Sequence, residues 1–455
     1  MSDLSRSVLG GNAPLGLLRG ESRPPTVCLL ALSIIADDPR VRRQGDIFHR
    51  NGWRVFGVGL PGGRSALPEW PILAKNQPSG GFAADRDRYE PSKLPRSALR
   101  SVLTATANYV RKKPRLRRLA STGWRLLGRC RLLLVRVRPG LAEKIFWSDP
   151  SLREMHELAD AVEADIWLAN DWTALPIAAR LAQKKGGLYV YDTHELATEE
   201  YAESLAWHLL RRPLVRALEG KLIRDAKVVS AVSAGIARRL DKLYSLPRPT
   251  LVIRNTPNYE PCQFRPTGER IRVLYHGIIA PGRGLEAAIH SVVDWRSEFD
   301  LSIRGPENPH FTPLLRARIT ERRLEGRVAL LQPVSMTTLV REASAYDVGL
   351  SVLPAHSRNN EFALPNKFFE YIMAGLAVCV TDLPEMAPLV RKYGLGVTLP
   401  SLDPVAIAAA INALDRETID GYKRNALRAA RELCWERESG RLLNAYSAVL
   451  QRAAA

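Results

Sequence analysis

The chain has 455 residues, of which 46% are hydrophobic and 25% are charged. This composition excludes a disordered chain, and the length exceeds what one ordinary hydrophobic core supports, so we expect two domains. The formal net charge of +19 predicts an anionic partner such as nucleic acid, an acidic lipid surface or a phosphorylated substrate.

The first half of the chain alternates short apolar runs with helical patterns. Residues 1–25 contain charges and glycines but no long apolar run, so we expect an N-terminal extension and no signal peptide. Strands are then predicted at residues 26–35, 53–60, 166–169, 188–191 and 227–232. Helices are predicted at 39–50 and 176–183, and a long helical pattern ends near residue 224. Residues 62–93 are predicted to be loop. Successive βα units predict a parallel sheet.

A second series of the same kind begins near Leu251. Short apolar runs predict strands at residues 273–276, 301–303, 328–331, 348–352, 378–380 and 397–399. We therefore predict an α/β protein with two Rossmann-like, doubly wound domains that face a cleft. The predicted bounds are 26–248 for the first domain, 249–434 for the second and 435–455 for a last helix that crosses back. Ligands of such domains bind beyond the carboxyl ends of the strands.

Residues 91–142 break the alternation. They contain fourteen Lys and Arg and no Asp or Glu, with apolar residues such as Trp124 and Leu127 between the charges. We predict a basic amphipathic insertion that binds an anionic membrane surface, where each nearby cation contributes about 1 kcal/mol. A solvated basic loop without a partner and a segment packed on an acidic face of its own fold are the alternatives.

The most informative run is NEFALPNKFFEYIMAG, which starts at Asn360. Pro365 is typical of the first turn of a helix, and in that helix Asn366, Lys367 and Glu370 share one face. A helix start with free N–H groups and a lysine suits a phosphate, and a carboxylate one turn later suits a ribose diol. The alternative interpretation is an amphipathic helix with a surface Lys–Glu pair.

This run resembles the C-terminal signature of retaining GT-B glycosyltransferases of family four. Other segments resemble the same family in the same order along the chain: DPRV at 38–41, NDW at 170–172, YDTHE at 191–195, YHG to GRGLE at 275–286, YDVGL at 346–350 and the last helix. The resemblance covers roughly residues 30–450 outside the basic insertion. It implies a hexosyltransferase that moves a sugar from a nucleoside-diphosphate sugar to a hydroxyl acceptor with retention, in cell-surface polysaccharide or glycolipid synthesis.

The resemblance implies roles on the donor side for five residues. Glu370 matches the glutamate that holds the donor ribose, and Asn366 lies one turn before it. Arg283 matches the cation that grips the diphosphate. Gly282 and Gly284 would let the backbone approach that diphosphate where a helix begins.

The resemblance also implies roles in the first domain. His194 matches the histidine that faces the donor sugar, with a packed loop histidine as the alternative. Arg40 and Asp171 are predicted to lie on the acceptor side.

The chain departs from the family pattern at two positions. Ile278 stands where the family often has an arginine, and we expect Lys367 to supply that cation. Phe362 stands eight residues before Glu370, where the family has a second glutamate. We predict that Glu361, one residue earlier, takes over its hydrogen bonding to the donor sugar.

The predicted chemistry needs no metal or other cofactor. The leaving phosphate can accept the proton of the acceptor hydroxyl, and fixed N–H groups with Arg283 and Lys367 would stabilise the charge that builds on it. The alternatives left open are a nucleotide-sugar epimerase and a catalytically silent module that binds nucleotide sugar or membrane. Nucleic-acid binding is not expected, because no recognised motif or aromatic stacking platform is present.

The sequence also predicts where the protein works. The five cysteines show no spacing typical of a zinc or redox site, which indicates a reducing cytoplasm. No run of about 18 apolar residues predicts a transmembrane helix. With the basic insertion, these features predict a peripheral protein on the cytoplasmic face of a membrane, whose acceptor is a lipid-linked sugar or a glycan.

Overall fold

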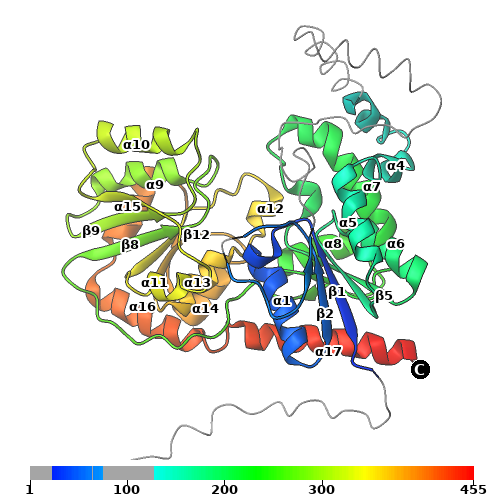
Figure 1. Cartoon of the computed structure of the whole chain (residues 1–455). Helices are drawn as coiled ribbons and strands as arrows, with labels where there is room; N and C mark the ends of the chain where they lie inside the picture. Colours follow the sequence, from blue (N-terminus) through cyan, green and yellow to red (C-terminus); the bar gives the residue numbers. More distant parts are fainter. Residues whose placement is uncertain (1–22, 64, 75–127, 455) are drawn as a thin grey trace, which may run out of the picture.

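The computed structural model describes residues 23–63, 65–74 and 128–454, and these form two α/β units side by side (Figure 1). The first unit holds a seven-stranded parallel sheet of β1 (Thr26–Ala31), β2 (Arg54–Val58), β3 (Ile72–Leu73), β4 (Ile166–Asn170), β5 (Leu188–Thr193), β6 (Val229–Ala231) and β7 (Leu251–Val252). The strands run in the order β3-β2-β1-β4-β5-β6-β7. Because β7 pairs with β6, this sheet extends past residue 248, where the sequence placed the end of the first domain.

The second unit repeats the same topology. Its sheet consists of β8 (Ile271–His276), β9 (Phe299–Arg304), β10 (Val328–Leu331), β11 (Val348–Ser351), β12 (Ala377–Thr381) and β13 (Gly396–Leu399). The strand order is β10-β9-β8-β11-β12-β13, and all pairings are parallel. The predicted two doubly wound domains are thus confirmed, and each sheet reverses its strand order at its first strand, β1 or β8.

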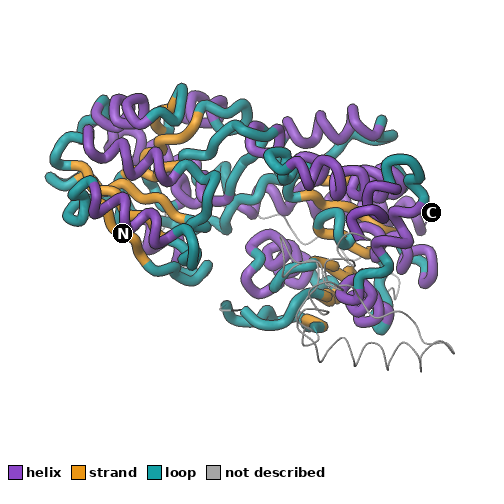
Figure 2. Tube along the Cα trace, turned by 90° about the horizontal axis from the view of Figure 1, so that it is seen from above, coloured by secondary structure: helices purple, strands orange, loops and turns teal. Residues whose placement is uncertain are grey.

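Helices cover both faces of each sheet (Figure 2). Those of the first unit are α1 (Pro39–Arg50), α4 (Leu141–Phe146), α5 (Pro150–Asp160), α6 (Leu175–Lys185), α7 (Arg212–Leu222) and α8 (Ala234–Tyr244). Those of the second are α9 (Leu285–Ser291), α10 (Thr312–Glu321), α11 (Leu339–Ala343), α12 (Arg358–Glu361), α13 (Asn366–Met373), α14 (Ala387–Tyr393), α15 (Pro404–Asn412) and α16 (Arg416–Ala429).

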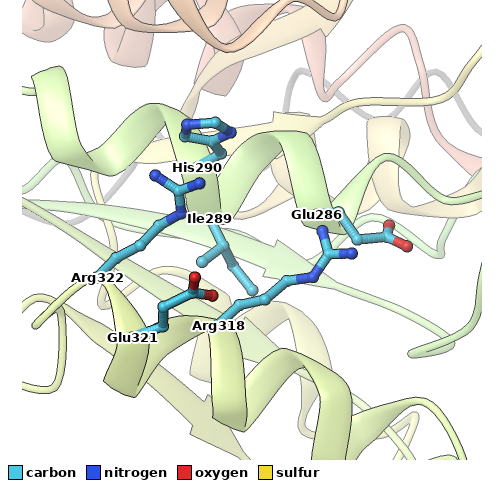
Figure 3. A pocket seen from close by; sticks show the side chains of 6 residues that line it. All are labelled: Glu286, Ile289, His290, Arg318, Glu321 and Arg322. Atoms are coloured by element: carbon cyan, nitrogen blue, oxygen red, sulfur yellow. The ribbon is translucent and has the colours of Figure 1, made fainter.

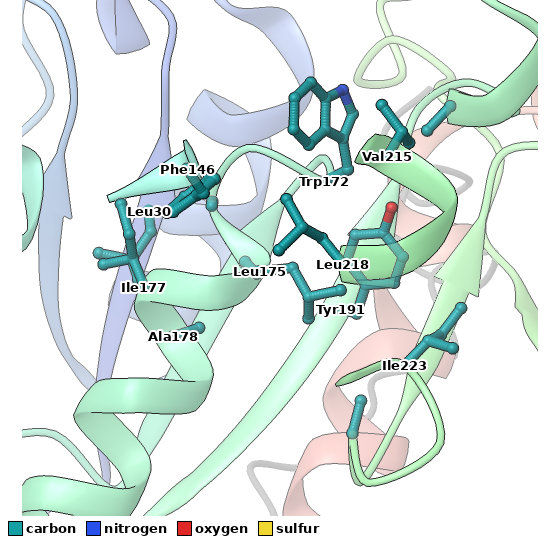
Figure 4. Close-up of a cluster of buried hydrophobic side chains, with 14 of the residues drawn as sticks. Leu30, Phe146, Trp172, Leu175, Ile177, Ala178, Tyr191, Val215, Leu218 and Ile223 are labelled. Carbon is teal, nitrogen blue, oxygen red and sulfur yellow. The ribbon is translucent and has the colours of Figure 1, made fainter. Parts of the chain in front are cut away.

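Alternation along β1 shows why the first sheet is buried on both faces. Cys28 and Leu30 point into a core formed with α5, α6 and α7, part of which Figure 4 shows. Val27 and Leu29 point into the opposite core. Successive side chains of a strand alternate between faces, so a strand that is covered twice is apolar throughout, as the burial of every β1 residue requires.

The C-terminal helix α17 (Trp435–Ala454) leaves the second unit and runs along the first (Figure 1). Its Tyr446 ring stacks on Phe48 of α1 at 5.5 Å between centroids, and Leu442 joins the same core. One element of the second half of the chain therefore forms part of the first unit's core.

The long helical pattern that ends near residue 224 corresponds to a continuous helical run over residues 205–222. Within this run, a π-helical turn at Trp207–Arg211 leads directly into α7. Pro213 follows the π-helical turn, and a proline inside a helix removes one N–H from the hydrogen-bond ladder, so the interruption of the regular α-helix coincides with the proline.

Most of the basic insertion, residues 91–127, lies outside the described residues. Its end is described and is helical at 128–134, beside α4. Among the described residues, no helix combines the length and the apolar character needed to cross a membrane.

Candidate active site

The loops at the carboxyl ends of the two sheets hold most of the predicted site residues. Asp171 directly follows β4, and His194 directly follows β5 in the first unit. In the second unit the loop after β8 contains Gly282 to Gly284, and α13 follows the loop after β11. This edge of a doubly wound sheet is where ligands bind, so the fold places these residues as the sequence predicts.

Helix α13 is built as its sequence predicts, with one difference at its start. Pro365 has extended backbone angles and precedes the helix, which begins at Asn366. Phe368, Phe369 and Ile372 are fully buried, so the opposite face turns Asn366, Lys367 and Glu370 away from the core. The chain then turns at Gly375, where a φ of 72° favours glycine. No hydrogen bond of the Asn366 side chain is present among the described residues.

Lys367 lies in an unusual environment for a lysine. Its Nζ is 3.7 Å from the centroid of the Tyr275 ring, and it packs against Gly277. Burial and the nearby Arg283 lower the pKa of Lys367 to about 7, and Glu370 opposes them only in part. An anion bound beside Lys367 and Arg283 would relieve this repulsion.

Glu370 is held by a histidine from the neighbouring strand. Nε2 of His276, the last residue of β8, lies 2.8 Å from Oε2 of Glu370. Burial raises the pKa of the Glu370 carboxyl, but the His276 hydrogen bond and the charges of Arg43 and Lys367 outweigh it, so the pKa lies below its usual value. Glu370 is thus an oriented carboxylate, ionised at neutral pH.

The loop before α9 brings the backbone close to the site. Gly282 and Gly284 both have a φ of 75°, which favours glycine. A Cβ on Gly284 would lie 2.1 Å from the carbonyl oxygen of Val352, so no larger residue fits there. Between the two glycines, Arg283 is close enough to affect the pKa of Lys367 and of Glu195 in the first unit.

His194 sits among acidic groups. Its Nδ1 lies 3.2 Å from Oδ2 of Asp171, and its Nε2 lies 3.5 Å from Oδ2 of Asp192. Burial lowers the pKa of His194, but Asp171, Asp192 and Asp38 outweigh it and raise the pKa to about 9. Asp171 also accepts a hydrogen bond from the His194 backbone N–H at 3.0 Å, and it adopts a left-handed φ of 63°. Asp171 therefore orients and charges His194.

Arg40, which the sequence places on the acceptor side, is buried beneath the surface of the first unit. Only 1% of Arg40 is exposed, and its Nε and Nη2 each lie 2.5 Å from an oxygen of Asp192. Gln44 and Ser230 donate to the same carboxylate, at 2.7 and 2.5 Å. Burial would raise the pKa of Asp192, but Arg40 holds it far below its usual range. Arg40 therefore stabilises the buried Asp192 carboxylate, which lies beside His194.

The two departures from the family pattern take clear positions. Ile278 is 55% exposed in the loop after β8. Glu361 pairs with Arg358 at 2.6 Å within α12, and no contact joins it to His194 or Lys367 among the described residues. Phe362 packs against Gly235 of the first unit, and its carbonyl accepts a hydrogen bond from Oγ of Ser233 at 2.7 Å.

Two residues of the site, His276 and Arg43, could not be found from sequence spacing. His276 is 94 residues from Glu370, to which it is hydrogen-bonded, and Arg43 belongs to the first unit. Arg43 donates to Oδ1 of Asn255 at 2.5 Å, and its buried Nε has no hydrogen-bond partner. Burial lowers the pKa of Arg43 to about 10 while Glu370 opposes this, so the charges of Arg43 and Glu370 interact across the two units.

A surface pocket between α9 and α10 lies apart from this edge (Figure 3). It is lined by acidic and basic side chains, from Glu286, Glu321, Arg318 and Arg322, together with His290 and Ile289. None of the predicted donor-side or acceptor-side residues lines it, and it does not alter the assignment of the site. Within the described ranges, no group of three or more His, Cys, Asp or Glu side chains could hold a metal ion.

Comparisons with known proteins concern the family and the fold. A family profile described as a glycosyl transferase 4-like domain matches residues 26–256, just over half of the chain. No curated protein sequence matches it.

Solved structures share the architecture of the whole chain. Sucrose-phosphate synthase from Thermosynechococcus elongatus has a TM-score of 0.66 at 16% identity, covering 95% of this chain and 100% of that one. Anabaena Alr3699/HepE, in complex with UDP and glucose, has a TM-score of 0.62 at 14% identity, with 93% and 100% covered. A glycosyltransferase from Rickettsia africae ESF-5 has a TM-score of 0.61 at 11% identity, with 94% and 99% covered. At these identities the likeness shows the fold alone.

Proposed function

The chain belongs to the glycosyl transferase 4-like family, and from this premise we propose that it moves a sugar from a nucleoside-diphosphate sugar to a hydroxyl acceptor with retention. It is a glycosyltransferase with the GT-B fold of two facing Rossmann-like domains. The donor is assigned to the carboxyl edge of the second sheet and the acceptor to the first domain.

The observation that carries this proposal is the group formed by Arg283, Lys367 and Glu370. Burial and the charge of Arg283 lower the pKa of Lys367 to about 7, and the ionised carboxylate of Glu370 stands one helical turn away. A nucleoside diphosphate presents the complementary pattern, because its anionic diphosphate adjoins a ribose diol that can donate two hydrogen bonds.

The proposed reaction exchanges two bonds at the anomeric carbon. The bond from this carbon to the diphosphate oxygen breaks, and the acceptor oxygen bonds to the same face of the carbon. The proton of the acceptor hydroxyl passes to the leaving phosphate oxygen, so no separate base is required. Negative charge grows on the diphosphate, where Arg283 and Lys367 stabilise it.

His194 serves this reaction as a cation and hydrogen-bond donor. With a pKa of about 9 it is protonated at neutral pH, which is unsuited to a general base. We assign its ring to the donor sugar, with Asp171 fixing its orientation through the 3.2 Å contact.

A thermal-shift panel tests the donor assignment. Because HepE structures contain UDP and UDP-glucose, the panel starts with UDP and UDP-hexoses and continues with GDP-mannose. A ligand that binds only the native state raises the melting temperature, by an amount that grows with its concentration. We expect a rise with at least one nucleotide sugar and its loss in Glu370→Gln. If no donor shifts the wild type and no transfer is detected, the proposal fails.

We also propose that the protein associates with an anionic membrane surface at its cytoplasmic face, where a lipid-linked acceptor would be reached. The described end of the basic insertion supports this. Leu132 and Val135 anchor it in the first core, whereas Leu133, Leu134 and Val137 are 41%, 50% and 80% exposed. Four exposed arginines flank these apolar side chains: Arg129, Arg131, Arg136 and Arg138. Exposed apolar and cationic groups on one anchored segment suit an interface.

Vesicle flotation tests the membrane proposal. The wild type should float with vesicles of phosphatidylcholine and phosphatidylserine and should stay down with phosphatidylcholine alone. Replacing the four flanking arginines by glutamine should abolish flotation. The matched control replaces four exposed arginines of the second domain: Arg316, Arg318, Arg322 and Arg341. Equal flotation of both variants would contradict the assignment of this segment, and transferase activity would be unaffected by that outcome.

A further inference from the structure

We infer that Glu195 of the first domain is the carboxylate that binds a hydroxyl of the donor sugar, in place of the glutamate that this chain lacks at position 362. The inference rests on the proposed function and deepens it. It assigns a specificity-determining residue that neither the helix signature nor the glycine-rich loop contains.

The Phe362 side chain occupies the place where the family has its second glutamate, so the second domain supplies no carboxylate from position 362. A Cβ on Gly235 would lie 2.4 Å from the Phe362 ring, so the ring fills the space directly over the first domain. The hydrogen bond of 2.7 Å from Ser233 to the Phe362 carbonyl fixes the backbone as well. The neighbouring Glu361 is occupied by Arg358 at 2.6 Å.

Glu195 is held in place from across the domain boundary. Nδ2 of Asn359 donates to Oε2 of Glu195, and Oδ1 of the same amide accepts from the Leu196 N–H at 2.8 Å. Only 5% of Asn359 is exposed, so the amide is a rigid clamp. The Glu195 side chain itself is exposed, and a carboxylate has about four lone-pair sites, so acceptor capacity remains for a ligand.

The surroundings of Glu195 connect it to both ends of the proposed donor. It directly follows His194, which is assigned to the sugar, and it is near Arg283, which is assigned to the diphosphate. In a nucleoside-diphosphate sugar, the sugar is bonded to the terminal phosphate. A carboxylate that directly follows His194 and interacts electrostatically with Arg283 is therefore assigned to a sugar hydroxyl.

The decisive comparison is between Glu195→Gln and Glu361→Gln. Glutamine keeps an oxygen that can accept from Asn359, so the clamp is retained while the charge is removed. Binding is measured by calorimetry for the nucleotide sugar selected by the thermal-shift panel and for its nucleoside diphosphate. We expect Glu195→Gln to weaken binding of the nucleotide sugar about 10- to 100-fold, because a hydrogen bond to a charged group is lost. Its affinity for the nucleoside diphosphate should stay within about twofold of the wild type.

Controls separate this role from a structural one. Glu163→Gln removes a carboxylate that is 75% exposed elsewhere in the first domain and should change neither affinity. Deoxy donors complete a mutant cycle: for the donor that lacks the contacted hydroxyl, wild type and Glu195→Gln should bind equally. Equal loss of both ligands in Glu195→Gln, or loss of sugar affinity only in Glu361→Gln, overturns the inference. A wild type that binds the nucleoside diphosphate but gains nothing from any sugar also overturns it. A wild type that binds neither instead rejects the proposed function.

Discussion

The charged side chains of the site are paired with opposite charges in the first domain but include two neighbouring cations in the second. In the first domain, Asp192 has no exposed surface and is bonded to Arg40, Gln44 and Ser230. In the second domain, Arg283 and Lys367 lie near each other, and within the described parts of the chain neither forms an ion pair.

This difference distinguishes charged residues that stabilise the fold from charged residues that would bind a ligand. A buried ion whose partners satisfy it stabilises one arrangement, and removing a partner exposes the cost of burying the other. A cation that is buried beside another cation is destabilised until an anion arrives. The first domain therefore contains a hydrogen-bond network around Asp192 in which the buried charge is satisfied. The second contains two cations whose charge a bound diphosphate would neutralise.

The largest effect is expected on the free energy of unfolding, when the pair between Arg40 and Asp192 is broken. Arg40→Met leaves Asp192 buried without its bidentate partner, and we expect the free energy of unfolding to fall by about 3–5 kcal/mol. Urea denaturation followed by circular dichroism measures this change. The matched control is Arg42→Met on the same helix, whose pair with Asp46 is partly exposed and should contribute about 0–1 kcal/mol. Equal losses in the two variants would contradict the special status of Arg40.

This contrast also marks how far the sequence could predict the site. The helix predicted at residues 39–50 agrees with α1, because Asp38 caps it and Pro39 suits its first turn. These are local signals. The same run placed Arg40 on the acceptor side without indicating its burial, since no local pattern distinguishes an exposed arginine from one that meets a carboxylate 152 residues away.

The second domain shows the same limit. The shared face of Asn366, Lys367 and Glu370 follows from helical spacing, and the structure agrees. The bond from His276 to Glu370 and the position of Arg43 depend on how strands and domains pack, which spacing does not encode. The packing of Phe362 on Gly235 likewise needs the domain arrangement.

The next largest effect is expected on diphosphate binding, when Lys367 is replaced. Lys367→Met should weaken binding of the nucleoside diphosphate at least about tenfold, since a charge-assisted contact is worth about 1.5–3 kcal/mol. It should leave nucleoside binding unchanged and should not lower the melting temperature, because a poorly solvated charge is removed. Calorimetry with UDP and uridine measures the first two quantities. The control is Lys392→Met, which removes a lysine that lies 4.8 Å over the ring of Tyr393, outside the site. An equal loss of uridine binding would indicate a structural role for Lys367.

A smaller effect is expected from pH. Free Lys367 has a pKa of about 7, and a bound diphosphate raises that pKa because it favours the charged form. Below pH 7 the lysine is already protonated, so affinity changes little. Above pH 7 binding must take up a proton, and the affinity for the diphosphate should fall by up to about tenfold per pH unit. Calorimetry in buffers of different ionisation enthalpy counts that proton at pH 8. Lys367→Arg should remove the uptake, and an unchanged uptake in this variant would assign the proton to another group.

The smallest effect should come from removing metal ions. If Arg283 and Lys367 supply the positive charge that stabilises the leaving diphosphate, they do the work that a divalent cation does in other phosphate sites. Transfer by the wild type should then be within about twofold of its normal rate after dialysis against EDTA. The sharper comparison uses Lys367→Met, since a site that has lost one cation has more to gain from an added one. Partial rescue of this variant by Mg²⁺, with no stimulation of the wild type, would place the missing charge at the diphosphate. A wild type that EDTA inactivates and Mg²⁺ restores would show instead that the two side chains do not suffice, and the donor site would have to include a metal.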